Sequence, residues 1–210
     1  MAPSTIEQFG KDLEAAPVIA ICRGVTPDTI IEVCEALVAG GVRFVETTLN
    51  SPDPIASIGK AAERFKDDGR VHIGAGTVLS ADQVDQVADA GGAYIISPNF
   101  NREVVRRTKE RGLISIPGFF TSSEAFSAVE AGADFLKCFP ARALGPGYIK
   151  DLKAVLPHPI MAVGGVNLDN ARDYLAVAVG LGIGSALFSP KKTPDQIKED
   201  ATEYMRRLRE

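Results

Sequence analysis

Short apolar segments recur along the whole chain at intervals of roughly 20–27 residues, and this repeat constrains the fold more than any other feature. Eight of them are typical of buried β-strands, at residues 18–22, 44–49, 71–75, 93–97, 113–117, 134–139, 160–163 and 179–183. The stretches between them are helix-like, and several end at a glycine, as helices commonly do. Strands that alternate with helices indicate an α/β fold with a parallel sheet.

Eight strand–helix units in 210 residues match the smallest closed (β/α)8 barrels. The competing fold is an open doubly wound sheet, which carries a glycine-rich fingerprint after its first strand. Here the first strand is followed by Arg23-Gly24-Val25, which is no such fingerprint. We therefore predict one domain over residues 1–210, a (β/α)8 TIM barrel. A capping box at residues 4–7 predicts an extra N-terminal helix over residues 4–15.

Composition gives no sign of a nucleic-acid or membrane partner. The net charge is −4, and no apolar run approaches the length of a membrane-spanning helix. The first eleven residues do not resemble a signal peptide, and three cysteines make no disulfide framework, so we expect a cytoplasmic protein. His72 and His158 are isolated from other possible ligands, so we expect no metal site.

Two charged residues interrupt the apolar segments. Lys137 lies in residues 135–139, where burial would favour the neutral amine, a nucleophile for carbonyl carbons. Glu46 lies in the second segment. The second and sixth strands of a barrel contribute to the same interior layer, so the two side chains should face each other. The alternatives are a lysine that extends from a strand end to solvent, and a purely structural ion pair.

The other strand ends carry groups that suit an anionic ligand. Gly164-Gly165 and Gly184-Ser185 follow the last two strands, where barrels often bind phosphate through backbone N–H groups, although glycines also make tight turns. Arg23 follows the first strand and suits a carboxylate, unless it is a surface arginine. Thr77 would donate a hydroxyl to the same carboxylate or cap the next helix.

Together these residues resemble the 2-keto-3-deoxy-6-phosphogluconate and 2-keto-3-deoxy-6-phosphogalactonate aldolases, and the resemblance covers nearly the whole chain. It rests on Glu46 and on motifs in a fixed order: RGVTP at 23–27, LNSP at 49–52, GAGTVL at 74–79, SPN at 97–99, PG at 117–118, FLKCFP at 135–140, GPGYIK at 145–150 and VGGV at 163–166.

The resemblance implies a class I aldolase that cleaves a phosphorylated keto-deoxy sugar acid to pyruvate and D-glyceraldehyde 3-phosphate without a cofactor. Lys137 would form the Schiff base and Glu46 would move protons. A homotrimer is also implied. The substrate-binding positions implied are Arg23, Thr77, Pro98, Phe139, Val163, Gly164, Gly165, Gly184 and Ser185.

Within this family the chain is more similar to the phosphogalactonate branch. The phosphogluconate branch typically carries an arginine four residues after the catalytic glutamate, where this chain has Asn50, and a threonine where it has Val163. An enzyme for the phosphogluconate epimer, or one that accepts both epimers, is the alternative. Different classes also stay open: a phosphosugar isomerase or epimerase with Glu46 as base, and a non-catalytic sugar-phosphate-binding barrel.

Two features depart from the family pattern. Phe119-Phe120 is bulkier than expected, and we expect it to narrow the mouth of the site. Arg142, after the sixth strand, either contacts phosphate or lies in solvent.

Overall fold

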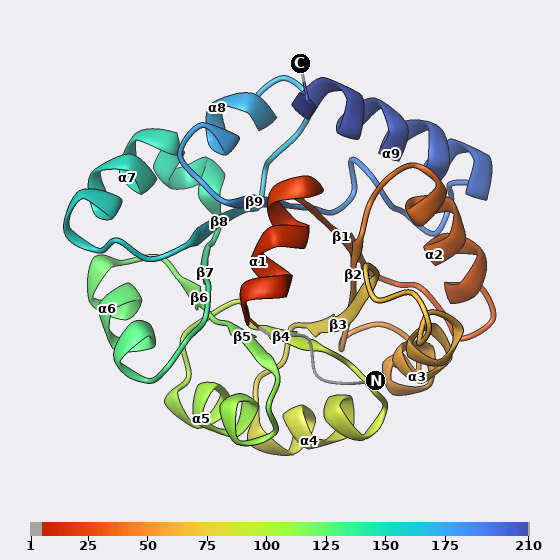
Figure 1. Cartoon of the computed structure of the whole chain (residues 1–210), viewed down its shortest axis with the longest axis horizontal. Coiled ribbons are helices and arrows are strands. Elements are labelled where there is room, and N and C mark those ends of the chain that lie inside the picture. Colours follow the sequence, from red (N-terminus) through yellow and green to blue (C-terminus); the bar gives the residue numbers. More distant parts are fainter. Residues whose placement is uncertain (1–5, 210) are drawn as a thin grey trace.

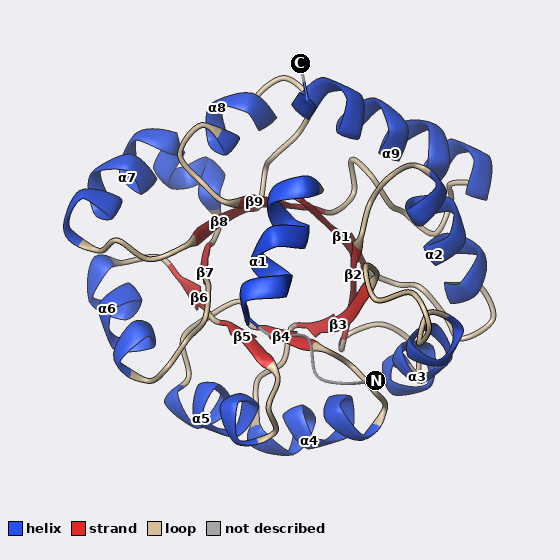
Figure 2. Cartoon of the chain, viewed as in Figure 1, coloured by secondary structure: helices blue, strands red, loops and turns tan. Residues whose placement is uncertain are grey.

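The computed structural model describes residues 6–209, and its parallel strands form a nearly closed barrel ringed by helices (Figures 1 and 2). Within these residues the strands are β1 (Val18–Cys22), β2 (Phe44–Thr48), β3 (His72–Gly76), β4 (Tyr94–Ile96), β5 (Ile114–Ile116), β6 (Gly118–Phe119), β7 (Leu136–Cys138), β8 (Ile160–Val163) and β9 (Gly180–Ile183). The helices are α1 (Ile6–Ala15), α2 (Ile30–Ala39), α3 (Pro54–Arg64), α4 (Ala81–Asp89), α5 (Arg102–Glu110), α6 (Ser122–Glu130), α7 (Ala141–Val155), α8 (Ala171–Leu175) and α9 (Pro194–Arg209).

The chain itself closes the barrel between β5 and β6. The sheet runs in the order β5-β4-β3-β2-β1-β9-β8-β7-β6, so its two edge strands are consecutive in sequence. The sequence predicts one strand over residues 113–117, whereas the structure has two short strands on either side of Pro117. Proline has no N–H to donate to a ladder. The Pro117 carbonyl still accepts a hydrogen bond from the Lys137 N–H at 2.9 Å, which ties this junction to β7.

Helix α1 lies across one end of the barrel (Figure 1). Its Phe9 is fully buried in the interior cluster, 5.6 Å from the ring of Tyr94 at the start of β4. Asp12 Oδ2 lies 2.7 Å from Nε2 of His72, the first residue of β3. Helix α1 therefore fills the amino-terminal end of the strands and leaves the carboxyl-terminal end open. The predicted helix began at residue 4, and residues 4 and 5 lie outside the described residues.

Alternate strand residues face outward and form a second core against the surrounding helices. Cys22 and Cys138 are fully buried there, as strand alternation predicts for the neighbours of Arg23 and Lys137. All three cysteines of the chain are free thiols. The two cores hold each strand between them, which fixes the direction of the interior side chains.

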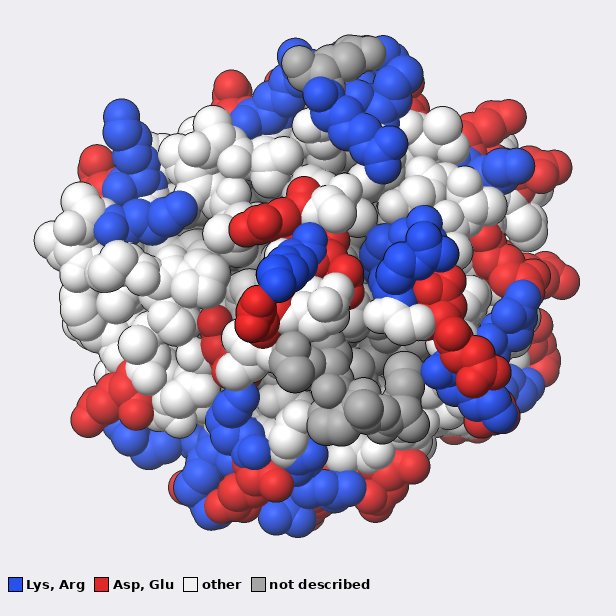
Figure 3. All heavy atoms as spheres, viewed as in Figure 1, with Lys and Arg blue, Asp and Glu red and all other residues white. Residues whose placement is uncertain are grey.

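On the face that carries α1, acidic and basic side chains lie side by side on α1 and along the lower and right-hand edges of the view, whereas much of the left side is uncharged (Figure 3). This mixture agrees with the small net charge of −4. None of the helices described is long and apolar enough to cross a membrane.

Candidate active site

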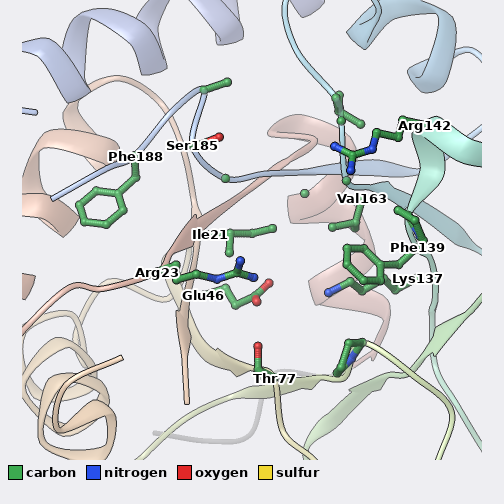
Figure 4. Close-up of a pocket in the computed structure, with 18 of the residues that line it drawn as sticks. Ile21, Arg23, Glu46, Thr77, Lys137, Phe139, Arg142, Val163, Ser185 and Phe188 are labelled. Atoms are coloured by element: carbon green, nitrogen blue, oxygen red, sulfur yellow. The ribbon is translucent and has the colours of Figure 1, made fainter. Parts of the chain in front are cut away.

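A pocket of about 520 Å³ opens at the carboxyl-terminal ends of the strands (Figure 4). Each strand ends at this rim, so residues far apart in sequence meet here. All the site residues predicted from the sequence line this pocket: Arg23, Glu46, Thr77, Pro98, Lys137, Phe139, Val163, Gly164, Gly165, Gly184 and Ser185. The structure thus brings these residues together around one pocket.

Lys137 from β7 and Glu46 from β2 point toward each other across the floor of the pocket (Figure 4). Only 6% of Lys137 and 2% of Glu46 is exposed. The Lys137 amine also lies 4.8 Å from the centre of the Phe139 ring, which forms part of the wall. A buried amine and a buried carboxyl group thus share one enclosed space.

Burial moves both groups toward their neutral forms. It lowers the pKa of the Lys137 amine, although the negative charge of Glu46 acts in the opposite direction; the Arg23 guanidinium lowers the pKa further. Burial also raises the pKa of Glu46, against the opposing effect of the Lys137 and Arg23 charges. A neutral amine can attack a carbonyl carbon, and a carboxyl group with a raised pKa can both give and take a proton.

Gly76 at the end of β3 provides the space for the Glu46 carboxyl group. A Cβ at position 76 would overlap the carboxylate and approach Glu46 Cγ to 2.7 Å. The sequence analysis assigned no role to Gly76, although it lies in the GAGTVL motif. A glycine two residues after another inward-facing glycine, Gly74, was the available signal for a large neighbour.

Arg23 is fixed at the rim through its neighbour. Gly24 has φ of +84°, and its N–H donates to Ser51 Oγ at 2.8 Å. Ser51 Oγ in turn lies 3.1 Å from the hydroxyl of Thr48, the last residue of β2. The turn after β1 is thereby attached to the end of β2, with the Arg23 guanidinium beside Glu46 (Figure 4). Sequence reasoning gave Ser51 no role.

Thr77 lines the opposite wall with an unusual backbone. Its φ is +60°, in the left-handed region that β-branched residues rarely adopt. Such strain concentrates at functional sites, where the surrounding structure holds the residue in place. The strained turn directs the Thr77 side chain toward the space between Arg23 and Lys137 (Figure 4).

The glycine loop after β8 is shaped by its glycines. Gly164 and Gly165 have φ of +95° and +82°, which only glycine adopts readily. The Gly164 carbonyl accepts a hydrogen bond from the Arg142 N–H at 3.0 Å, and the Gly165 carbonyl accepts one from Asn170 Nδ2 at 3.0 Å. Both carbonyls are held by protein donors, and the backbone between them borders the pocket.

After β9 the chain makes a tight turn. The Gly184 carbonyl accepts hydrogen bonds from the N–H groups of Leu187 and Phe188, each at 2.9 Å. Ser185 lies within this turn, and its hydroxyl projects into the pocket (Figure 4). The glycine loop and this turn together form one end of the pocket, built mainly from backbone and small side chains.

The expectation for Phe119 and Phe120 is wrong. Phe119 is 1% exposed and packs in the outer core, and Phe120 is 45% exposed; neither lines the pocket. Phe119 lies one residue out of phase with Gly118, which pairs with Lys137, so it faces outward. Arg142 does line the pocket. Among residues 6–209, no group of three or more His, Cys, Asp or Glu side chains could hold a metal ion.

The chain matches the family model of KDPG and KHG aldolase over residues 9–205. It is 42% identical over 197 residues to the 2-dehydro-3-deoxy-6-phosphogalactonate aldolase of Escherichia coli (strain K12), covering 92% of this chain and 95% of that protein. A solved structure described as native KDPGal is 41% identical, with a TM-score of 0.88 over 92% of this chain and 94% of that one.

A more distant structure bears on the chemistry. The KDPG aldolase of Legionella pneumophila, with pyruvate captured as a covalent carbinolamine intermediate, is 30% identical with a TM-score of 0.83. The match covers 92% of this chain and 96% of that one.

Proposed function

This chain belongs to the KDPG and KHG aldolase family, and we propose that it is a class I aldolase that cleaves 2-dehydro-3-deoxy-6-phosphogalactonate to pyruvate and D-glyceraldehyde 3-phosphate. The observation that carries the proposal is the buried Lys137 amine, which faces Glu46 at the floor of the pocket. Asn50 and Val163, where the phosphogluconate branch typically has arginine and threonine, favour the phosphogalactonate substrate. So does the higher identity to relatives with that name.

In this reaction the neutral Lys137 amine attacks the C2 carbonyl of the keto acid and forms a carbinolamine. Loss of water gives a protonated Schiff base, which accepts electrons as the C3–C4 bond breaks. Glu46 takes the proton from the C4 hydroxyl, directly or through a water, and a proton returns to the enamine carbon. Hydrolysis then releases pyruvate. The carbinolamine captured in the Legionella pneumophila relative supports the first of these steps.

Binding at both ends of the substrate would place the C3–C4 bond over the lysine. Arg23 and Thr77 bind the carboxylate next to C2. The backbone of the glycine loop and of the turn after β9 binds the phosphate at the other end of the pocket. Two fixed ends hold the reacting atoms close together, which is a large source of rate acceleration. The walls from Pro98, Phe139 and Val163 complete the enclosure.

Incubation of the protein with pyruvate and borohydride, followed by intact mass and peptide mapping, tests the chemistry. The expected result is one reduced adduct, located at Lys137 and absent from Lys137→Met. A protein that binds pyruvate without an adduct would refute the Schiff-base mechanism. Comparison of kcat/KM for the two C4-epimeric substrates then tests the substrate. Equal or inverted values would favour the dual-specificity or phosphogluconate enzyme.

The proposal also covers the barrel type, the oligomeric state and the location of the protein. The barrel counts as a (β/α)8 barrel with an added N-terminal helix if β5 and β6 are taken as one strand interrupted at Pro117. The family resemblance supports a homotrimer, and the free cysteines support a location in the cytoplasm. Light scattering on the purified protein tests the trimer.

A further inference from the structure

Arg142 extends into the pocket from the start of α7. Its own N–H holds the Gly164 carbonyl at 3.0 Å, so the base of the side chain is attached to the glycine loop. Figure 4 shows the guanidinium turned away from α7 into the pocket, beside the end of β8 at Val163. Arg142 therefore reaches the end of the pocket that lies away from Glu46.

The glycine loop is shaped to accept the stem of this arginine. A Cβ at Gly165 would lie 2.6 Å from Arg142 Cβ and 2.7 Å from its Cδ. The missing side chain at Gly165 thus leaves room for the Arg142 methylene groups to pack on the loop backbone. This packing places the stem against the loop, while the residue as a whole stays exposed, so the guanidinium is accessible to a ligand.

Within residues 6–209 the guanidinium pairs with no acidic side chain. Many other arginines of the chain form ion pairs, for example Arg64 with Glu35 and Arg111 with Asp89. In the part of the chain that the structure describes, the Arg142 side chain forms no hydrogen bond or ion pair. A planar guanidinium that lines a pocket and lacks a carboxylate is well suited to bind an anion in bidentate geometry.

We propose that Arg142 is a side-chain ligand of the phosphate group and determines how strongly the enzyme prefers phosphorylated substrates. This deepens the proposed function and rests on it. The backbone of the glycine loop supplies neutral N–H donors, and Arg142 adds a positive charge at this end of the pocket. A phosphate monoester approaches two negative charges above pH ~6, so the contribution of Arg142 is largest at neutral pH and declines with salt.

Two substitutions separate charge from packing. Arg142→Met keeps most of the stem over Gly165 and removes the charge, whereas Arg142→Lys keeps the charge without the planar fork. Arg102→Met is the matched control, because Arg102 is an exposed arginine on α5 that pairs with Glu130. Titration with inorganic phosphate measures the ligand directly and does not require turnover. We expect Kd to rise about 10-fold in Arg142→Met, less in Arg142→Lys and not at all in the control.

Kinetics link this site to the reaction. In Arg142→Met, kcat/KM for the phosphorylated acid should fall about 10-fold, while the rate of pyruvate trapping at Lys137, a phosphate-free reaction, stays at the wild-type value. Unchanged phosphate binding in Arg142→Met would overturn the proposal, as would equal losses in turnover and in pyruvate trapping. A wild-type protein that binds phosphate through Arg142 but never traps pyruvate would refute the aldolase mechanism instead.

Discussion

Replacement of Gly76 by alanine should disable the Glu46 carboxyl group without touching Lys137. An alanine Cβ at position 76 would overlap Glu46 Oε1, whereas real Cβ atoms keep more than 3.0 Å from such neighbours. The carboxyl group must therefore retreat by more than about 1 Å. Because the nearest atoms all belong to one side chain, the backbone can stay in place. A displacement of about 1 Å in a reacting group can cost about 100-fold in rate.

We expect Gly76→Ala to fold, to lose about 1–3 kcal/mol of stability from overpacking, and to lose about 100-fold in kcat. Pyruvate release, coupled to NADH oxidation, measures kcat, and urea denaturation measures stability. The control is Gly59→Ala on α3, where a Cβ would meet only the Ala90 carbonyl oxygen at 3.8 Å. That variant should keep the wild-type kcat.

A double substitution tests the cause. Glu46→Asp shortens the side chain by one methylene group and withdraws the carboxyl group from the added Cβ. Adding Gly76→Ala to Glu46→Asp should therefore cost much less than the 100-fold that it costs alone, because both substitutions act on one group. Activity of Gly76→Ala within twofold of wild type, or losses that multiply independently in the double variant, would refute the reasoning.

Three further substitutions follow from the pocket. Burial lowers the pKa of Lys137 and the Arg23 guanidinium lowers it further, so Arg23→Gln should raise the pKa of Lys137. An uncharged β-diketone reacts only with the neutral amine, so its rate of modification should reach a plateau at higher pH in Arg23→Gln than in wild type. An unshifted pH profile would contradict this prediction. Ser51→Ala leaves the half-buried Gly24 N–H without its acceptor and should raise KM for the keto acid about 2–10-fold with little change in kcat. Thr77 has a left-handed backbone, which costs a residue with a side chain about 1–2 kcal/mol and which glycine adopts freely. Thr77→Gly should therefore show no loss of stability in urea denaturation, although a side chain is removed. The KM for the keto acid should rise, because the Thr77 hydroxyl is lost.

The positions of the pocket residues could be predicted because a parallel barrel brings all its strand ends to one rim. Once residues 44–49 and 134–139 are identified as strands, Glu46 and Lys137 must point inward together, since Cys138 has to pack under the helices. The break at Pro117 followed from the same sequence, yet it was not predicted. Pro117 cannot donate a backbone hydrogen bond to a neighbouring strand, so the predicted strand is divided into β5 and β6.

The complementary small residues were harder to predict. Gly76 and Gly165 have neighbours, Glu46 and Arg142, that come from other strands and helices. A glycine in the sequence indicates that space is left at its position. Which side chain occupies that space can be known only from the folded structure. The same limit applied to Phe119, whose direction depends on its register with β7.

The reactivity of the pocket depends on the opposite end of the barrel. Phe9 of α1, Tyr94 and the other interior side chains form an apolar cluster that fills the amino-terminal end of the barrel, below the pocket floor. The ring of Tyr94 lies against Gly74, two residues before the glycine that accommodates Glu46. Burial is the largest cause of the pKa shifts of both Lys137 and Glu46. Helix α1 therefore contributes, from the end of the barrel opposite the pocket, to the burial on which the pKa shifts of Lys137 and Glu46 depend.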